Sequence, residues 1–384
     1  MVSETQFFTF ASADVPFVCV SGELLPEVVL AYSTYGQLNA DASNAILIFH
    51  ALSGSHHAAG TMREVPGVGE LWTEECHTGW WTEYIGPGRT LDTDKYFVVC
   101  ANMLGGCYGS TGPRSLDPRT GRPYGSRFPH LCARDVVAAT LRLLDHLGIA
   151  RLHAVIGPSI GGLLALTFAT NHPERVRIVV PLASGVRTTV LTRLILFEQL
   201  LAIENDPHFR GGDYYDGEPP EIGLALARMI SHKTFVHLDT IEHRAKRTVV
   251  QSDDHFAWYR LRFPVESYML HQGRTFVNRF DANTYLRFVE LWSGYDPLVE
   301  AGASTMTSLL EPCKKAGHHF LVFTIDSDFC FYPEEQTALV HHLRHSGVSH
   351  MYVTVHSEKG HDSFLLEPEL YAPHLMYTLE RFGR

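Results

Sequence analysis

The sequence lacks the features that mark several large classes of protein. Its 384 residues contain no apolar run near the roughly 20 residues that a membrane-spanning helix needs. The first residues show neither the basic segment nor the apolar segment of a secretory signal. Lys and Arg number 31 against 42 Asp and Glu, which gives a formal net charge of −11 at pH 7. We therefore expect a cytoplasmic protein with no nucleic-acid partner and no membrane partner.

Motifs for metals and bound cofactors are also missing. The seven cysteines are odd in number and show no CxxC spacing, which predicts reduced thiols. There is no HExxH helix, no zinc-type Cys/His spacing and no P-loop. The segment GVGELW, which begins at Gly67, lacks the third glycine and the preceding strand of a dinucleotide site. We expect no metal and no permanently bound cofactor.

Apolar residues, in contrast, are plentiful enough for a large core, at 45% of the chain against 19% charged residues. Short runs of Val, Ile, Leu and Phe without polar alternation are typical of strands that are covered on both faces. These runs occupy 45–50, 96–102, 152–157, 177–184, 320–326 and 350–356. Helical patterns occupy 133–148, the segment after Ser159, and 334–347. Strands that alternate with helices predict a mostly parallel α/β sheet.

One long stretch interrupts this alternation. From about residue 187 to 296 there is no clear strand pattern, and three segments look helical. These segments are 192–206, 221–238 and 285–296. We interpret the stretch as a helical insertion over the sheet. The expected domains are a core of residues 1–186 and 297–384 and a helical lid of residues 187–296.

A serine between glycines is the clearest chemical feature. Ser159 lies in Gly157-Pro158-Ser159-Ile160-Gly161, which follows a predicted strand and precedes a predicted helix. This is the context of the G-x-S-x-G nucleophile elbow, in which glycines allow strand and helix to pack closely around a strained corner. The amide of Ile160 would then point at a developing oxyanion. A plain glycine turn is the alternative interpretation.

A serine nucleophile needs a base, and the base needs an orienting acid. In this architecture the three follow the chain order Ser, Asp or Glu, His. Asp328, with Asp326 as the alternative, comes just after the strand predicted to end at 326. His361 comes after the last predicted strand. Both positions are carboxyl ends of strands, where such sheets build their sites.

A second oxyanion donor is expected from the loop after the strand predicted at 45–50. The amide of Leu52 is the candidate, and an ordinary strand-to-loop turn is the alternative. With 23 histidines in the chain, most are expected to be ordinary surface or core residues. These are expected to include His56, His57, His318, His319, His341 and His342.

Several segments resemble one family. They are HALSGS at 50–55, the block from Gly79 to Gly125, FDANTYL at 280–286, SDFCFYP at 327–333 and GHDSFLLE at 360–367. Together they are similar to the homoserine O-acyltransferases of the α/β-hydrolase superfamily, and to the homoserine O-acetyltransferases in particular. The resemblance implies an α/β-hydrolase fold: a mostly parallel central sheet, flanking helices and a helical lid. It also implies a homodimer formed through the lid.

The implied reaction is the ping-pong transfer of an acetyl group from acetyl-CoA, a co-substrate, to the hydroxyl of L-homoserine in methionine biosynthesis. By the same resemblance Ser159 would be acylated, with His361 as the base and Asp328 as its orienter. Leu52 and Ile160 would form the oxyanion hole.

Two further residues match the family's acceptor site. Arg228 corresponds to a lid arginine associated with the carboxylate of homoserine, and Asp362 to the acid associated with its amino group. The chemistry agrees, because a zwitterion needs a cation for its carboxylate and an anion for its ammonium. A solvated lid arginine is the alternative for Arg228. A general esterase has no use for such a pair, so the pair favours acyl transfer.

The chain departs from the family's pattern at several positions. Pro158, Ile160 and Leu164 replace Gly, Met and Gln around the serine, Phe235 replaces a Tyr, and Tyr108 replaces a Lys. These changes leave the acyl-enzyme mechanism possible and leave the donor and the acceptor open. Succinyl-CoA, serine as acceptor and an esterase on the same triad remain alternatives. An inactive binding protein is a further alternative, against which the intact triad argues.

Overall fold

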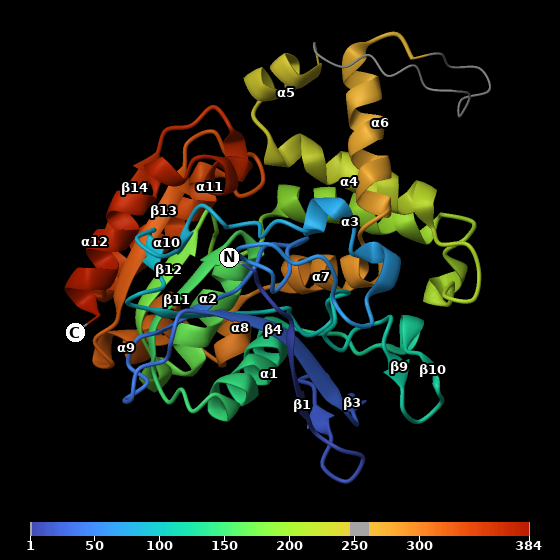
Figure 1. Ribbon diagram of the computed structural model, residues 1–384. Coiled ribbons are helices and arrows are strands. Elements are labelled where there is room, and N and C mark those ends of the chain that lie inside the picture. Colours follow the sequence, from blue (N-terminus) through green and yellow to red (C-terminus); the bar gives the residue numbers. More distant parts are fainter. Residues whose placement is uncertain (1, 246–260, 384) are drawn as a thin grey trace.

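The computed structural model describes residues 2–245 and 261–383 and centres on an eight-stranded sheet (Figure 1). The strand order is β1-β4-β8-β5-β11-β12-β13-β14, with parallel pairing from β8 to β14 and antiparallel pairing at β1 and β4. The strands are β1 (Gln6–Phe10), β4 (Val28–Tyr35), β5 (Ala45–Ile48), β8 (Phe97–Ala101), β11 (Leu152–Pro158), β12 (Val176–Leu182), β13 (His319–Ile325) and β14 (Ser349–Val355). The predicted mostly parallel α/β sheet is confirmed. The antiparallel strands β1 and β4 were not expected from the sequence.

Both faces of the sheet are covered, which explains the continuous apolar runs. In β11, Leu152 and Val155 pack into one apolar cluster, while Ala154 and Ile156 pack into the cluster on the opposite face. The helices that flank the sheet or end the chain are α1 (Ala133–His146), α2 (Ile160–Asn171), α8 (Pro297–Ala301), α9 (Met306–Lys315), α10 (Pro333–Ser346), α11 (Ser363–Leu366) and α12 (Ala372–Phe382). Helices α1, α2 and α10 contribute to the first cluster and α12 to the second. The two hydrophobic cores hold the central strands, and therefore their carboxyl ends, in place.

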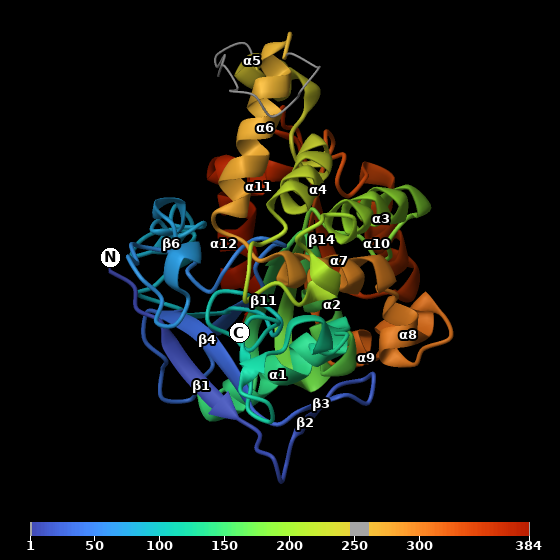
Figure 2. The ribbon, with the colours of Figure 1, turned by 90° about the vertical axis from the view of Figure 1, so that its right-hand side faces the viewer.

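The elements described between β12 and α8 are helical. They are α3 (Val190–Glu204), α4 (Glu221–Phe235), α5 (Leu238–Ala245), α6 (Pro264–Val277), α7 (Ala282–Gly294) and a short 3-10 turn at Arg210–Gly212. We call α3 to α7 the lid helices. Figures 1 and 2 show α4, α5 and α6 standing above the core, with α7 running beneath them next to it. Residues 246–260 of the predicted insertion lie outside the described residues. Within the described ranges, no helix has both the length and the apolar character that crossing a membrane requires.

Candidate active site

Ser159 lies at the corner between β11 and α2, in a backbone conformation that few residues other than glycine adopt. Its φ of 57° and ψ of −128° would cost about 1–3 kcal/mol without support from the surroundings. The glycines around it give that support by allowing close packing. A Cβ at Gly157 would lie 1.9 Å from the Gly161 oxygen, and one at Gly162 would lie 2.5 Å from Ser184 Cβ. The glycines therefore serve the serine corner, as the nucleophile-elbow prediction requires.

The elbow lies directly against the loop that follows β5. A Cβ at Gly161 would come within 2.4 Å of the Phe49 oxygen, so the start of α2 and the start of this loop nearly touch. The amide of Leu52 in this loop donates no hydrogen bond to the described residues. The amide of Ile160 is the first of α2 and has no acceptor within the helix. These two amides have the freedom that oxyanion donors need.

His50, at the start of the same loop, holds the loop in shape. The Met103 amide donates to His50 Nε2 at 3.1 Å, and His50 Nδ1 lies 2.8 Å from the Ala51 oxygen. Because an amide can only donate, Nε2 accepts and Nδ1 carries the proton that binds Ala51. Burial lowers the pKa of His50 to about 4, which keeps the ring neutral and this arrangement intact. The oxyanion loop, which we define as residues 49–55, is thus fixed at the residue before Leu52.

Asp328 and His361 are brought together from the ends of two neighbouring strands. His361 Nδ1 lies 2.7 Å from Asp328 Oδ2, and both side chains are buried. Asp328 is itself held by the amides of Cys330 and Phe331 at 2.7 and 3.0 Å and by Gln336 Nε2 at 2.9 Å. Every oxygen of this carboxylate is therefore hydrogen-bonded. Such a carboxylate can orient a histidine ring firmly.

The protonation of His361 reflects two opposing effects. Burial lowers its pKa, but the charge of Asp328 and the hydrogen bond to it outweigh burial and raise the pKa well above its usual value. The Nε2 atom is buried and has no hydrogen-bond partner among the described residues. The hydrogen bond to Ser159 is thus not made in this structure, as is common in sites without substrate. Asp328 therefore stabilises the imidazolium that forms when Nε2 takes a proton from Ser159 or from a bound acceptor.

Asp326, the alternative acid, faces elsewhere. Its carboxylate binds His356 Nδ1 at 2.6 Å and the Ser357 amide at 3.3 Å, at a half-exposed position. It therefore supports the loop after β14. Of the two candidate acids, Asp328 is the one that contacts His361.

Arg228 reaches the site from lid helix α4. Its guanidinium lies over two aromatic rings, 5.2 Å from the centre of Phe235 and 4.8 Å from that of Phe276. The Nε atom is buried without a hydrogen-bond partner in the described chain. Burial, followed by the charge of Arg279, lowers the pKa of Arg228. This is a cation held rigidly by flat apolar surfaces.

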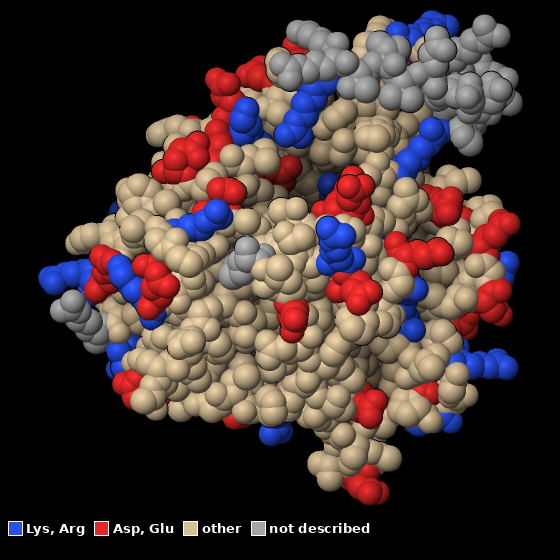
Figure 3. Space-filling view, in the orientation of Figure 1, with Lys and Arg blue, Asp and Glu red and all other residues tan. Residues whose placement is uncertain are grey.

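Asp362 supplies the opposite charge next to His361. Burial raises the pKa of Asp362, although the charges of His361 and Arg228 oppose the rise. No ion pair joins Arg228 and Asp362, both of which are described. Figure 3 shows a hollow between the lid helices and the core, with an acidic and a basic side chain visible inside it. The site therefore presents separate anionic and cationic groups beside its base.

Comparisons with known proteins agree with this geometry. Residues 44–368 match the family model described as the alpha/beta hydrolase fold. Homoserine O-acetyltransferase of Solidesulfovibrio magneticus is 40% identical over 94% of this chain and 89% of its own length. Homoserine O-succinyltransferase of Aromatoleum aromaticum is 42% identical over 93% of this chain and 92% of its own length. The chain belongs to the homoserine O-acyltransferase family of α/β-hydrolases.

The fold of this chain also matches that of a solved homoserine O-acetyltransferase. The crystal structure of homoserine O-acetyltransferase from Bacillus anthracis matches with a TM-score of 0.87 and 26% identity, over 100% of this chain and 99% of that one. The acyltransferase family thus accounts for the whole described chain, lid helices included. The names of these relatives divide between acetyl and succinyl transfer, so the family alone leaves the acyl group open.

The positions that depart from the acyltransferase pattern are buried around the site. Pro158 ends β11 and pairs with Leu182, where its missing amide proton leaves the ladder unbroken. Leu164 is fully buried in the core. Phe235 packs on His361 at a ring distance of 6.0 Å, and the Tyr108 hydroxyl contacts Arg279. None of these contacts disturbs the Asp328–His361 pair.

Three site residues escaped the sequence analysis. His50 holds the oxyanion loop, Gln336 holds Asp328, and Arg279 reaches the same loop from the lid. Nothing in the sequence marks Gln336 as a site residue, because it lies within the helix predicted at 334–347. His50 is the first residue of the HALSGS segment that carried the family resemblance, and Arg279 directly precedes the FDANTYL segment.

Proposed function

We propose that this protein transfers an acetyl group from acetyl-CoA to the side-chain hydroxyl of L-homoserine. The observation that carries the proposal is the pair Arg228 and Asp362, placed beside the buried Asp328–His361 pair. The buried pair supports acyl-serine chemistry in general. The two separate charges select an amino acid as the acceptor rather than water.

The first half-reaction acylates the enzyme. Ser159 Oγ attacks the thioester carbonyl and gives its proton to His361 Nε2. The amides of Leu52 and Ile160 stabilise the negative oxygen of the tetrahedral intermediate. The carbon–sulfur bond then breaks, and the CoA thiol leaves with the proton from His361. An acetyl ester on Ser159 remains.

The second half-reaction needs an oriented alcohol. In our proposal Arg228 binds the carboxylate of homoserine and Asp362 its ammonium group, which brings the hydroxyl to His361 Nε2. His361 takes the hydroxyl proton as the oxygen attacks the acetyl ester. The ester bond to Ser159 breaks, Ser159 regains the proton, and O-acetylhomoserine leaves. The product would enter methionine biosynthesis.

The deciding experiment measures CoA thiol release with acetyl-CoA or succinyl-CoA, each offered with homoserine, with serine and without acceptor. We expect release that depends on homoserine and is fast with acetyl-CoA. Release that needs serine would keep the mechanism and change the acceptor. Release that ignores both acceptors would make water the acceptor and the protein an esterase. The variant Ser159→Ala serves as the blank in every arm.

We also propose a homodimer formed through the lid and a cytoplasmic location. Support for the dimer comes from apolar side chains exposed along α3, which are Val190, Leu191, Leu194, Phe197 and Leu201. Support for the location comes from the seven cysteines, all of which are free. Sedimentation as a monomer at micromolar concentration would contradict the dimer.

A further inference from the structure

Phe235, the last residue of α4, contacts two groups of the site that have different tasks. Its ring centre lies 5.2 Å from the Arg228 guanidinium and 6.0 Å from the ring of His361. Arg228 precedes it by seven residues, which is nearly two helical turns, so both side chains leave the same face of α4. The Phe235 side chain is buried. One buried ring therefore touches both the cation assigned to the acceptor carboxylate and the base assigned to the acceptor hydroxyl.

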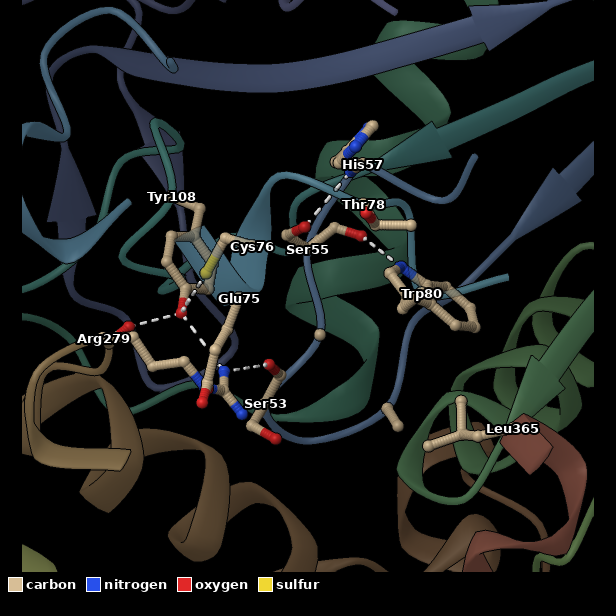
Figure 4. Close-up of a pocket in the computed structure, with 12 residues that line it drawn as sticks. Ser53, Ser55, His57, Glu75, Cys76, Thr78, Trp80, Tyr108, Arg279 and Leu365 are labelled. Carbon is tan, nitrogen blue, oxygen red and sulfur yellow. Dashed lines mark hydrogen bonds and ion pairs between the residues drawn. The ribbon is translucent and has the colours of Figure 1, made fainter. Parts of the chain in front are cut away.

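Aromatic rings are the contacts that fix Arg228. Its guanidinium also lies 4.8 Å from the ring centre of Phe276, and it has no hydrogen-bond or ion-pair partner among the described residues. Arg279 lies 5.1 Å from the centre of the same ring but is held differently. Its Nη1 donates to the Ser53 oxygen at 3.3 Å and to the Tyr108 hydroxyl at 3.4 Å, as Figure 4 shows. Loss of a ring should therefore displace Arg228, whereas Arg279 would keep its hydrogen bonds.

The end of α4 is fixed against the loop that carries His361. Gly360 has a φ of 68°, and a Cβ there would lie 2.7 Å from the His237 nitrogen and 3.1 Å from the Phe235 oxygen. Glycine permits both this φ and this close approach of two backbones. The position of Phe235 relative to the base is thus set by backbone contact, and its ring passes that position on to Arg228.

His361 has other contacts that hold its ring. The Phe331 ring is stacked on it at 5.7 Å, the Phe364 ring meets it edge-on at 5.4 Å, and Asp328 binds its Nδ1. The base should therefore keep its orientation when the ring at the end of α4 is removed. Acylation of Ser159 needs this base and the oxyanion amides, so it should continue in such a variant.

We propose that Phe235 is a positioning residue that makes the acceptor site selective for the length of homoserine. The hydroxyl of homoserine lies one methylene group farther from the carboxylate than the hydroxyl of serine. When the cation that binds the carboxylate is fixed relative to the base, only one of these hydroxyls reaches His361 Nε2. The ring acts through Arg228 and takes no part in the chemistry. This inference rests on the proposed acyl transfer to homoserine.

The test measures kcat/KM for homoserine and for serine with acetyl-CoA as donor, together with the acetyl-enzyme burst without acceptor. Phe235→Leu keeps an apolar side chain but removes the ring, so it should lower the value for homoserine about tenfold and change that for serine less than about threefold. The burst should change less than about threefold, because His361 keeps its other contacts. Phe235→Tyr keeps the ring and should stay within about threefold of the wild type throughout.

The matched control is Phe209→Leu. Phe209 is a buried lid residue whose ring lies 6.3 Å from that of Tyr214, and no ring contact joins it to Arg228 or His361, all of which are described. Its loss should leave the selectivity between homoserine and serine unchanged. Phe235→Met repeats the test if thermal melting shows that the leucine variant is much less stable than the wild type.

A double-mutant cycle separates a positioning role from a structural one. Because the ring acts through Arg228, adding Phe235→Leu to Arg228→Ala should lower kcat/KM for homoserine less than about twofold further. Losses that multiply would overturn the proposal, and so would equal losses in the burst and in transfer, which would assign the ring to His361. Unchanged selectivity in Phe235→Leu would also overturn it and would leave the proposed function standing. If the wild-type enzyme releases thiol equally with and without homoserine, the proposed function itself fails.

Discussion

The site has a core half, formed by residues of the sheet domain, and a lid half, formed by residues of the lid helices. The polar groups of these two halves differ in how they are hydrogen-bonded. In the core, both Asp328 oxygens are bound by backbone or Gln336, and this carboxylate in turn binds His361. In the lid, Arg228 is held by aromatic rings, and its Nε has no hydrogen-bond partner among the described residues. Groups that act in both half-reactions are oriented in advance, whereas the group assigned to the acceptor keeps its hydrogen bonds for a ligand.

The largest expected effect tests the core half. Ser159→Ala should lower acyl transfer by about 10⁴-fold or more, because the covalent intermediate cannot form. Thiol release from acetyl-CoA in the presence of homoserine measures the loss. Circular dichroism and thermal melting should match the wild type, since alanine occupies the same corner. Turnover within about tenfold of the wild type would exclude the acyl-serine route.

The next effect tests the lid half, and it should separate the two half-reactions. Arg228→Ala should lower kcat/KM for homoserine by about 100-fold, because the acceptor carboxylate loses a charge-assisted partner. The rate of the acyl-enzyme burst, measured without acceptor, should change less than about threefold. Arg193→Ala is the matched control, because this α3 arginine binds the Ser293 oxygen at 3.0 Å. Equal losses in the burst and in transfer would assign Arg228 to structure or to CoA.

A difference between buried and edge strands explains which parts of the fold the sequence could predict. Strands covered on both faces, such as β11 and β13, appear as unbroken apolar runs and were predicted. β1 lies at the sheet edge with largely exposed residues, and β4 interleaves Ser33 and Thr34 with its apolar positions. β1 has no pattern that distinguishes a strand from a loop, whereas the apolar run 28–32 at the start of β4 was an available signal for a strand that went unused.

The site residues also divide into those that the sequence could predict and those that it could not. Ser159, Asp328 and His361 were singled out because a glycine-flanked corner and a fixed chain order leave local marks in the sequence. His50 acts through the Met103 amide, 53 positions along the chain, and Arg279 through Ser53, 226 positions away. Contacts at such separations depend on the completed fold, and no local pattern encodes them.

Glu335 is an exception to the hydrogen-bonded polar groups of the core half. Its substitution should have the smallest effect on activity. It lies in the first turn of α10 next to Gln336, is 6% exposed, and both its carboxyl oxygens lack hydrogen-bond partners in the described chain. Burial, with a further contribution from the charge of Asp328, raises the pKa of Glu335 from 4.5 to about 8.

The sign of its effect on stability follows from proton binding. Between pH 4.5 and about 8 the folded protein keeps a proton on Glu335 that the unfolded chain has lost, so the free energy of unfolding falls as pH rises. The cost is absent below the unfolded pKa and complete above the folded one, where it reaches at most about 5 kcal/mol at about 1.4 kcal/mol per pH unit. Glu335→Gln should remove this slope. Its melting temperature relative to the wild type should therefore rise steadily from pH 5 to pH 8.5, with activity at pH 7 within about threefold. If the difference in melting temperature between the variant and the wild type stays constant across this range, Glu335 is ionised in the folded protein. It would then need a hydrogen-bond partner, as Asp328 has.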